Sequence, residues 1–277
     1  MSKYFNINDN YRITKFISML SIIAIFFEII MFFVHPVRFQ QGFFLLLFTL
    51  ITVMFLLMVR RSFMVIFLLS TFTLIASWRL SALAHYHIVT WILTIAMVFK
   101  LINYLLFAYE SIQAKNGVSP FEHQITLFEW QLLFIRLFIG FDLIPHFCEK
   151  LFAGSAVRAD DVHAFIQLGV HYPLTMVFIV GIMEFGGALA LSCGLFTRLG
   201  SICLAIYMLT ATYLGHHFSN GFIWASPGGG WEYPVLWTVL ILSFALFGAG
   251  DFSIDRYLKD RFHLPQWIKH IMGGRCS

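Results

Sequence analysis

The sequence predicts an all-α integral membrane protein with eight transmembrane helices, arranged as two groups of four. Three observations lead to this fold class: 60% of the 277 residues are hydrophobic, only 12% are charged, and the mean hydropathy is +0.82. A soluble domain carries roughly 25% charged residues, and half that share cannot cover a surface that faces water. The same composition excludes disordered, collagen-like and disulfide-rich secreted proteins.

Eight apolar segments predict the eight helices, and charged or turn-forming residues separate them. The segments are 14–34, 41–59, 63–83, 87–109, 128–147, 172–194, 199–218 and 233–249. Each reaches or nearly reaches the roughly 20 residues that a helix needs to cross the hydrocarbon core. None shows the alternation of a membrane β-strand, so we expect helices throughout.

The distribution of Lys and Arg predicts a bacterial-type inner-membrane protein with both termini in the cytoplasm. The first segment is too long for a signal-peptide core and lacks a small-residue cleavage site, so we expect it to be retained. With this orientation, twelve basic residues lie on the inner side: Lys3, Arg12, Lys15, Arg60, Arg61, Lys115, Arg198, Arg256, Lys259, Arg261, Lys269 and Arg275. Only Arg38, Lys150 and Arg158 lie on the outer side, as the positive-inside rule requires.

Four regions follow from this layout: a four-span region at 1–110, a cytoplasmic connection at 111–127, a second four-span region at 128–250 and a basic amphipathic tail at 251–277. We expect the tail to lie on anionic lipid, and nothing in the sequence indicates nucleic-acid binding. Within the second region, 159–170 predicts a short surface helix. The Gly- and Pro-rich stretch 219–231 predicts a flexible, irregular cap.

Six charged residues fall inside predicted spans, where charge is costly and is usually paired or functional. At about 1.5 Å per residue, opposite charges lie at matching depths. The expected pairs are Arg136 with Glu184, Lys100 with Glu28, and Arg79 with Asp142. Two interpretations remain open: structural ion pairs that hold helices together, or a polar cavity that takes a ligand or relays protons.

Eleven histidines are many for this length, and the predicted topology places eight on or near the outer face: His35, His85, His87, His146, His163, His171, His216 and His217. They could be interfacial side chains, a quinone headgroup site, or ligands of a metal or haem. Adjacent His216 and His217 would point about 100° apart on a helix, and only His85 and His87 are weak metal candidates. Haem or copper is not excluded. The four cysteines form no C-x-x-C pair, which argues against a disulfide-generating enzyme.

Four sequence runs in the second region share the character of one family. They are FIRLFIGFDLIPHFCEKLFAG, GIMEFGGALALSCGLFTRLGS, YLGHHFSNGF and WEYPVLWTVLILSFALFGAGDFSID. In this order, over residues 128–256, the chain resembles the DoxX/DoxD group, which includes the small membrane subunit of thiosulfate:quinone oxidoreductase. The matching polar residues are Arg136, His146, Lys150, Glu184, Arg198, His216, Glu232 and Asp255. Phe147 stands where the family pattern has Gly, and its ring would narrow the site that His146 lines.

The resemblance implies a four-helix bundle linked to quinone-dependent redox chemistry or to maturation of redox partners. On this basis His146, His216 and Lys150 are expected catalytic residues at the outer face. The residues Arg136, Glu184, His217 and Glu232 are expected to bind the cofactor, a quinone, and Arg198 is expected to anchor a cytoplasmic turn.

Three functions remain open at this point. The first is a quinone-interacting membrane subunit of an extracytoplasmic redox system. The second is a non-enzymatic anchor or assembly subunit for a redox or metal-handling partner, another membrane or periplasmic protein. The third is a transporter, which the lack of matching broken helices in both halves disfavours. Whether the chain is an enzyme stays open.

Overall fold

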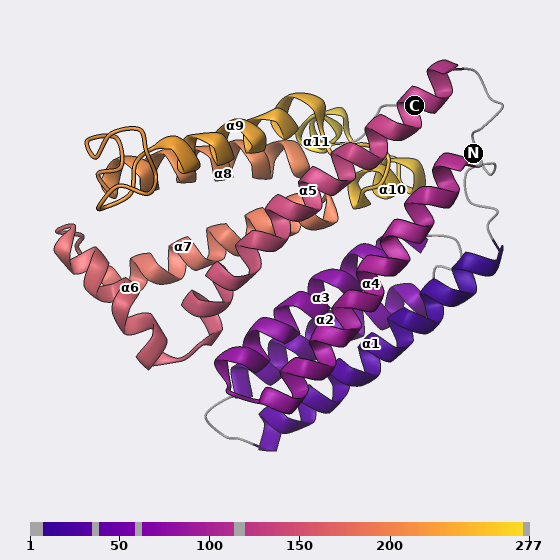
Figure 1. Cartoon of the computed structure of the whole chain (residues 1–277), viewed down its shortest axis with the longest axis horizontal. Helices are drawn as coiled ribbons and strands as arrows, with labels where there is room; N and C mark the ends of the chain where they lie inside the picture. The colour runs from indigo at the N-terminus through magenta and orange to yellow at the C-terminus, as the bar shows by residue number, and fades with distance from the viewer. Residues whose placement is uncertain (1–7, 35–38, 59–62, 114–119, 274–277) are drawn as a thin grey trace. The chain divides into compact units, whose positions relative to one another are not determined.

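The computed structural model describes residues 8–34, 39–58, 63–113 and 120–273, which form helices and connecting turns without strands (Figure 1). The chain divides into two compact units, Met1–Phe134 and Ile135–Ser277. Several predicted surface charges lie outside the described residues: Lys3, Arg38, Arg60, Arg61, Lys115 and Arg275. His35 and Cys276, with residues 114–119 of the connection and the end of the tail, lie there too.

The first unit is a bundle of α1 (Asn8–Val34), α2 (Phe39–Met58), α3 (Phe63–Leu83) and α4 (His87–Gln113), joined by the beginning of α5 (Pro120–Phe152). Helices α1 to α4 are rich in Leu, Phe and Ile and contain no proline that would interrupt their backbone hydrogen bonds. Helix α1 packs against α2, α3 and α4. Helix α3 is far more buried than α1 or α4 and supplies much of the core.

The second unit continues from α5 through α6 (Ser155–Gln167), α7 (Pro173–Ala188), a π-helical turn (Leu189–Cys193), α8 (Thr197–Leu214) and α9 (Glu232–Phe247). Two short helices follow, α10 (Ile254–Arg261) and α11 (Gln266–Ile271). Helix α7 begins at a proline, whose fixed φ suits the first helical position. The π-helical turn continues α7 as far as Cys193, and the helix stops at Gly194, which has a φ of +66°. Helices α8 and α9 lie side by side (Figure 1).

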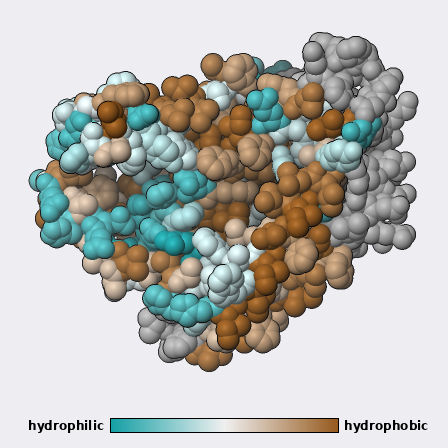
Figure 2. All heavy atoms as spheres, in the orientation of Figure 1, coloured by the Kyte–Doolittle hydropathy of each residue, from teal (hydrophilic) through white to brown (hydrophobic). Residues whose placement is uncertain are grey.

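The chain is a multi-pass membrane protein. Five described helical segments are long and apolar enough to cross a bilayer: Phe16–Val34, Met64–Leu83, His87–Tyr109, Pro173–Cys193 and Thr197–Leu214. Two shorter apolar segments are Gln40–Met54 and Glu232–Phe247. Large apolar side chains cover much of the face in Figure 2, and a soluble monomer does not expose such areas. All eight predicted segments fall on helices, while the count of eight spans and their 4+4 arrangement stay predictions.

The smaller elements of the second unit also follow the sequence. The predicted surface helix is α6, which begins four residues earlier than expected, and the basic tail forms α10 and α11. The stretch 219–231 is irregular, as predicted, but it is held by several hydrogen bonds. The backbone N–H groups of Trp231 and Glu232, for example, donate to the carbonyls of Gly221 and Phe222 at 3.1 and 3.0 Å.

Candidate functional site

Three helices of the second unit bring together Lys150, Glu184 and Tyr207, which we call the polar triad. Lys150 Nζ on α5 lies 3.2 Å from Glu184 Oε1 on α7. The Tyr207 hydroxyl on α8 donates to the same oxygen at 2.7 Å. Lys150 is 9% exposed and Glu184 3% exposed, so the ion pair is buried. Glu184 thereby links three helices at one point.

The close approach of α5 and α7 positions this ion pair. Gly181, one helical turn before Glu184, faces Leu151 and Lys150, and a Cβ added there would lie 2.8 Å from a Leu151 methyl carbon. Only a residue without a side chain allows the two helices to come this near. Arg158 of α6 donates to the carbonyl of Lys150 at 3.2 Å and lies over the Phe178 ring. These contacts fix the end of α5 that carries the lysine.

The second carboxylate oxygen of Glu184 is unsatisfied. Oε2 is buried and has no hydrogen-bond partner among the described residues, whereas Oε1 has both Lys150 and Tyr207. Buried polar atoms are nearly always paired in folded proteins, and an exception calls for an explanation such as a catalytic role or an absent ligand. The triad can therefore accept one more hydrogen bond or exchange a proton at Glu184 Oε2.

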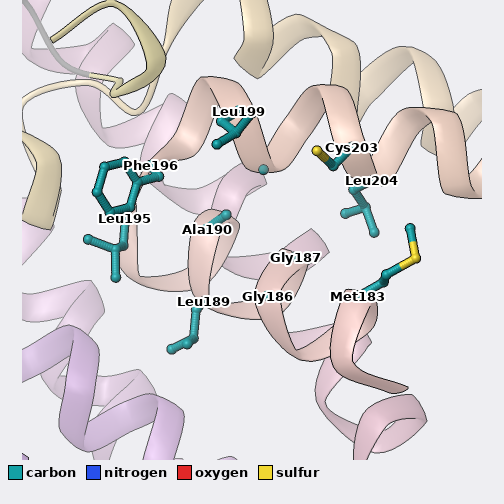
Figure 3. A pocket seen from close by; sticks show the side chains of 11 residues that line it. Met183, Gly186, Gly187, Leu189, Ala190, Leu195, Phe196, Leu199, Cys203 and Leu204 are labelled. Atoms are coloured by element: carbon teal, nitrogen blue, oxygen red, sulfur yellow. The ribbon is translucent and has the colours of Figure 1, made fainter. Parts of the chain in front are cut away.

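An apolar groove of about 360 Å³ lies between α7 with its π-turn and α8 (Figure 3). Its lining comes from residues between positions 183 and 204, among them Met183, Gly186, Leu199 and Cys203. The π-helical turn Leu189–Cys193 forms one end of this region, and such turns occur frequently at functional sites. The groove thus lies between two of the three helices that carry the triad.

A second polar cluster is centred on Arg136 and Asp255. It lies at the turn that connects α7, through its π-turn, to the start of α8. Arg136 donates to the carbonyls of Ala249 and Phe252 at 2.5 and 2.6 Å. The Asp255 carboxylate accepts from the backbone N–H groups of Phe196 and Thr197 at 2.7 and 2.9 Å, at the start of α8.

Asp255 also accepts from the N–H of Gly273, at 2.6 Å. Burial raises the pKa of the Asp255 carboxyl, and the N–H donors act in the opposite direction. Gly194 completes the cluster: a Cβ at this left-handed position would lie 2.6 Å from Arg136 Nη1. The cluster ties the segment after α9 to the turn before α8.

The predicted pairing of Arg136 with Glu184 is therefore wrong. Arg136 binds backbone carbonyls near the end of the bundle, and Glu184 pairs with Lys150, which the topology had placed on the outer surface. The side chain of Lys150 instead bends into the bundle. Of the residues expected to be catalytic or to bind a cofactor, Lys150 and Glu184 are the two that the structure joins by a side-chain contact.

The outer histidines do not join the triad. His146 and His216 are both exposed, and neither imidazole has a hydrogen bond within the described part of the chain. Phe147 does not narrow a site at His146, because its ring is fully buried and packs edge-on against Phe185. His217 Nδ1 lies 3.0 Å from the Gly229 carbonyl and helps to hold the loop before α9.

The remaining predicted site residues have other surroundings. Glu232 accepts from the backbone N–H of Trp224 at 3.3 Å, which places it in the same loop. Arg198 reaches the Leu246 carbonyl at 3.5 Å, and its role as a turn anchor stays a prediction. The rings of His85 and His87 lie 6.3 Å apart. Over the described ranges, no group of three or more His, Cys, Asp or Glu side chains could hold a metal ion.

The predicted pair of Lys100 and Glu28 is also wrong. Lys100 Nζ donates to the hydroxyls of Ser18 and Ser70 at 2.8 and 2.6 Å, whereas Glu28 accepts from Ser77. Arg79 and Asp142 belong to different units, so their pairing stays a prediction.

Tyr207 is the site residue that the sequence analysis missed. The sequence feature that could have revealed it is a tyrosine in the middle of the predicted span 199–218. The hydroxyl of such a residue needs a polar partner once its ring is buried. A search for uncharged partners of the buried charges would have found it.

The family model that matches this chain covers residues mainly in its second half, which contains the polar triad. The DoxX family model matches residues 131–217. An uncharacterized protein of Haemophilus influenzae is 31% identical over 80 residues, which are 29% of this chain and 60% of that protein. The match thus spans less than two thirds of the relative's length. No solved structure matches the chain. Residues 131–217, which contain the polar triad, therefore match the DoxX family model, which is consistent with the DoxX-like resemblance of the sequence motifs.

Proposed function

We propose that this chain is a quinone-interacting membrane subunit of an extracytoplasmic redox system, and that the polar triad binds the quinone head group. One observation carries the proposal: a buried ion pair has an unused carboxylate oxygen next to an apolar groove. That oxygen, Glu184 Oε2, is a buried acceptor that a hydroxyl of the reduced head group, the quinol, would satisfy. The residues present therefore fit a quinone.

The chemistry of the triad suits a ligand that changes its protonation. A quinone takes up two electrons and two protons when it becomes a quinol. The Lys150 ammonium has further N–H donors for a carbonyl oxygen, while the Tyr207 hydroxyl donates its one proton to Glu184 and holds the carboxylate in place. Glu184, held by both, can exchange a proton at Oε2. The electrons would come from a membrane or extracytoplasmic protein or from a small reductant.

The placement of the ion pair supports a role beyond stability. Burying two charges costs more than their attraction returns in many proteins, so a buried pair is weak evidence of stabilisation. Intramembrane ionisable residues more often mark ligand sites or proton paths. A site that binds lipid-soluble quinone also needs no opening to water, because its ligand arrives through the membrane.

Bound quinone in the purified protein tests this proposal. After gentle purification of the full chain, organic extraction should yield quinone at close to one molecule per chain. The variant Tyr207→Phe should retain about two- to tenfold less, because it removes the hydrogen bond that positions Glu184, which is worth about 0.5–1.5 kcal/mol. Tyr213→Phe is the matched control, because Tyr213 lies on the same helix and is 72% exposed. It should retain as much quinone as the wild type.

Two results would contradict the proposal. One is the absence of quinone from the wild-type extract together with no quinone binding on its addition. The other is equal quinone content in both tyrosine variants. Copurification of a stoichiometric protein partner in a quinone-free preparation would favour the anchor or assembly function instead.

A further inference from the structure

We infer that the apolar groove between α7 and α8 holds the isoprenoid tail of a quinone whose head group lies at the polar triad. This inference rests on the proposed function and adds a tail-binding subsite, which selects long-chain over tail-free quinones. Three features carry it: the continuity of groove and triad, the apolar lining, and the open space at Gly186.

Groove and triad are one helical turn apart on two facing helices. On α7, Glu184 and Gly187 are three residues apart and share a face. On α8, Leu204 and Tyr207 have the same spacing. Because Glu184 contacts Tyr207 and Gly187 packs against Leu204, the two contacts are successive rungs between the same helices. Gly187 and Leu204 line the groove, so this part of the groove lies about 5 Å along the helix axis from the triad.

The lining of the groove suits a hydrocarbon chain and no polar ligand. Met183, Leu199 and Leu204 supply side-chain surface, and Cys203 presents a thiol (Figure 3). The volume of about 360 Å³ lies within the roughly 300–1,000 Å³ of small-molecule sites. Phe196, at 38% exposed, and Leu199, at 43% exposed, border it. A chain could therefore enter from the surrounding lipid.

Gly186 keeps part of the groove empty. A Cβ added at this residue would meet no atom within 4 Å, so no neighbouring helix explains the glycine. At Gly187 and Gly200, by contrast, a Cβ would lie 2.9 and 2.2 Å from atoms of Leu204 and Ala190. Those two glycines allow helix contact, while Gly186 leaves space that a ligand can fill.

The tail gains little energy by leaving lipid for the groove, because both surroundings are apolar. The groove instead orients the molecule, so that the head group reaches Glu184 and the chain points along α7 and α8. A phospholipid could place an acyl chain in the same groove, but its headgroup would not match the triad. The connection between the two sites therefore favours a quinone tail.

Filling the groove at Gly186 tests the inference. Gly186→Phe adds a ring where space is open, and Ile182→Phe adds one to the same helix at a 60% exposed position outside the groove. Each full-length protein is placed in nanodiscs. The dissociation constants are then measured for a ubiquinone with a long isoprenoid tail and for duroquinone, which has none.

We expect Gly186→Phe to weaken binding of the long-tailed quinone on the order of tenfold, as a mismatched hydrophobic pocket does. Its affinity for duroquinone should stay as in the wild type. Ile182→Phe should change neither constant. A long-tailed quinone with a photoreactive group in its tail should label residues 183–204 of the wild type and lose that labelling in Gly186→Phe.

The outcomes separate this inference from the proposed function. Unchanged binding of both quinones by Gly186→Phe, with labels spread over other helices, would overturn the tail subsite and leave the head-group site intact. Failure of the wild type to bind either quinone would overturn the proposed function and the inference together. Labelling of the groove by a photoreactive phospholipid, undiminished by excess long-tailed quinone, would overturn the quinone tail as its occupant.

Discussion

Each unit of the molecule buries a lysine and a glutamate, but the two units surround them differently. In the first unit, Lys100 donates to two serine hydroxyls and Glu28 accepts from a third, so the two charges have separate partners. In the second, Lys150 and Glu184 form an ion pair that Tyr207 joins. The sequence composition of the two units does not reveal this difference, because both place opposite charges within apolar helices.

The space near these residues differs as well. In the first unit, the hollow bounded by Phe67, Asn103 and Trp130 is too small to hold water, and Phe67 lies under the Lys100 ammonium. In the second, the triad adjoins a groove of about 360 Å³. Glu28 and Glu184 each have one oxygen without a partner in the described residues, and Glu184 combines it with a contacting cation and a groove between its helix and α8. The comparison supports the proposed ligand binding in the second unit and a packing role for the buried charges of the first.

The largest effect is expected from removing the two lysines in turn. Lys150→Met leaves the Glu184 carboxylate buried without its cation, which should lower the free energy of unfolding by about 3–5 kcal/mol. Lys100→Met removes an amine that has only hydroxyl partners, and the cost should be about 1 kcal/mol or less. Thermal unfolding of the full chain in one detergent measures both.

A double variant sharpens the first result. Lys150→Met combined with Glu184→Gln should regain most of the lost stability, because the unpaired charge is gone. Equal destabilisation by the two single lysine variants would contradict the distinction between the units.

A smaller effect is expected from the polar groups that tie elements together. In the first unit, the Thr73 hydroxyl donates to the Leu69 carbonyl of its own helix, at 2.8 Å. Asp255 of the second unit instead links α10 to the start of α8 and to Gly273. Asp255→Asn replaces an acceptor oxygen by a donor that faces N–H groups, and should cost about 1–3 kcal/mol.

Thr73→Val is the matched variant for the first unit, since it keeps the shape of the side chain. It should cost less than about 1 kcal/mol. Chemical unfolding in detergent compares the two variants. If Thr73→Val were the more harmful, the view that Asp255 stabilises the second unit by linking separate elements would be wrong.

The sequence was sufficient to predict the class of fold because helices in lipid need long apolar runs. All eight predicted segments lie on helices, although α5 begins at Pro120, eight residues before its predicted segment. The first turns of α5 are polar and include Glu122 and Glu129, so the apolar pattern of the sequence does not indicate that the helix begins at Pro120. The π-turn at Leu189–Cys193 could not be predicted, because nothing in an apolar run marks a local change of helical hydrogen bonding.

The candidate site was predicted only in part. Span positions gave the depth of each buried charge but not the direction in which its side chain points around the helix. Depth therefore matched Arg136 with Glu184, although Arg136 faces the carbonyls of Ala249 and Phe252. Lys150 was placed on the outer surface because it lies beyond the apolar run, yet its long side chain reaches inward. Partner choice depended on orientations that only the structure provides.

Quinone binding by two glutamate variants tests the central claim most directly. Glu184→Gln and Glu28→Gln make the same chemical change at a buried carboxyl in each unit. The dissociation constant for a long-tailed ubiquinone is measured with the full chain in nanodiscs. The account predicts binding weakened on the order of tenfold or more for Glu184→Gln, as for the loss of a hydrogen bond to a charged group, and unchanged binding for Glu28→Gln. Equal constants for the two variants, or weaker binding by Glu28→Gln alone, would contradict it.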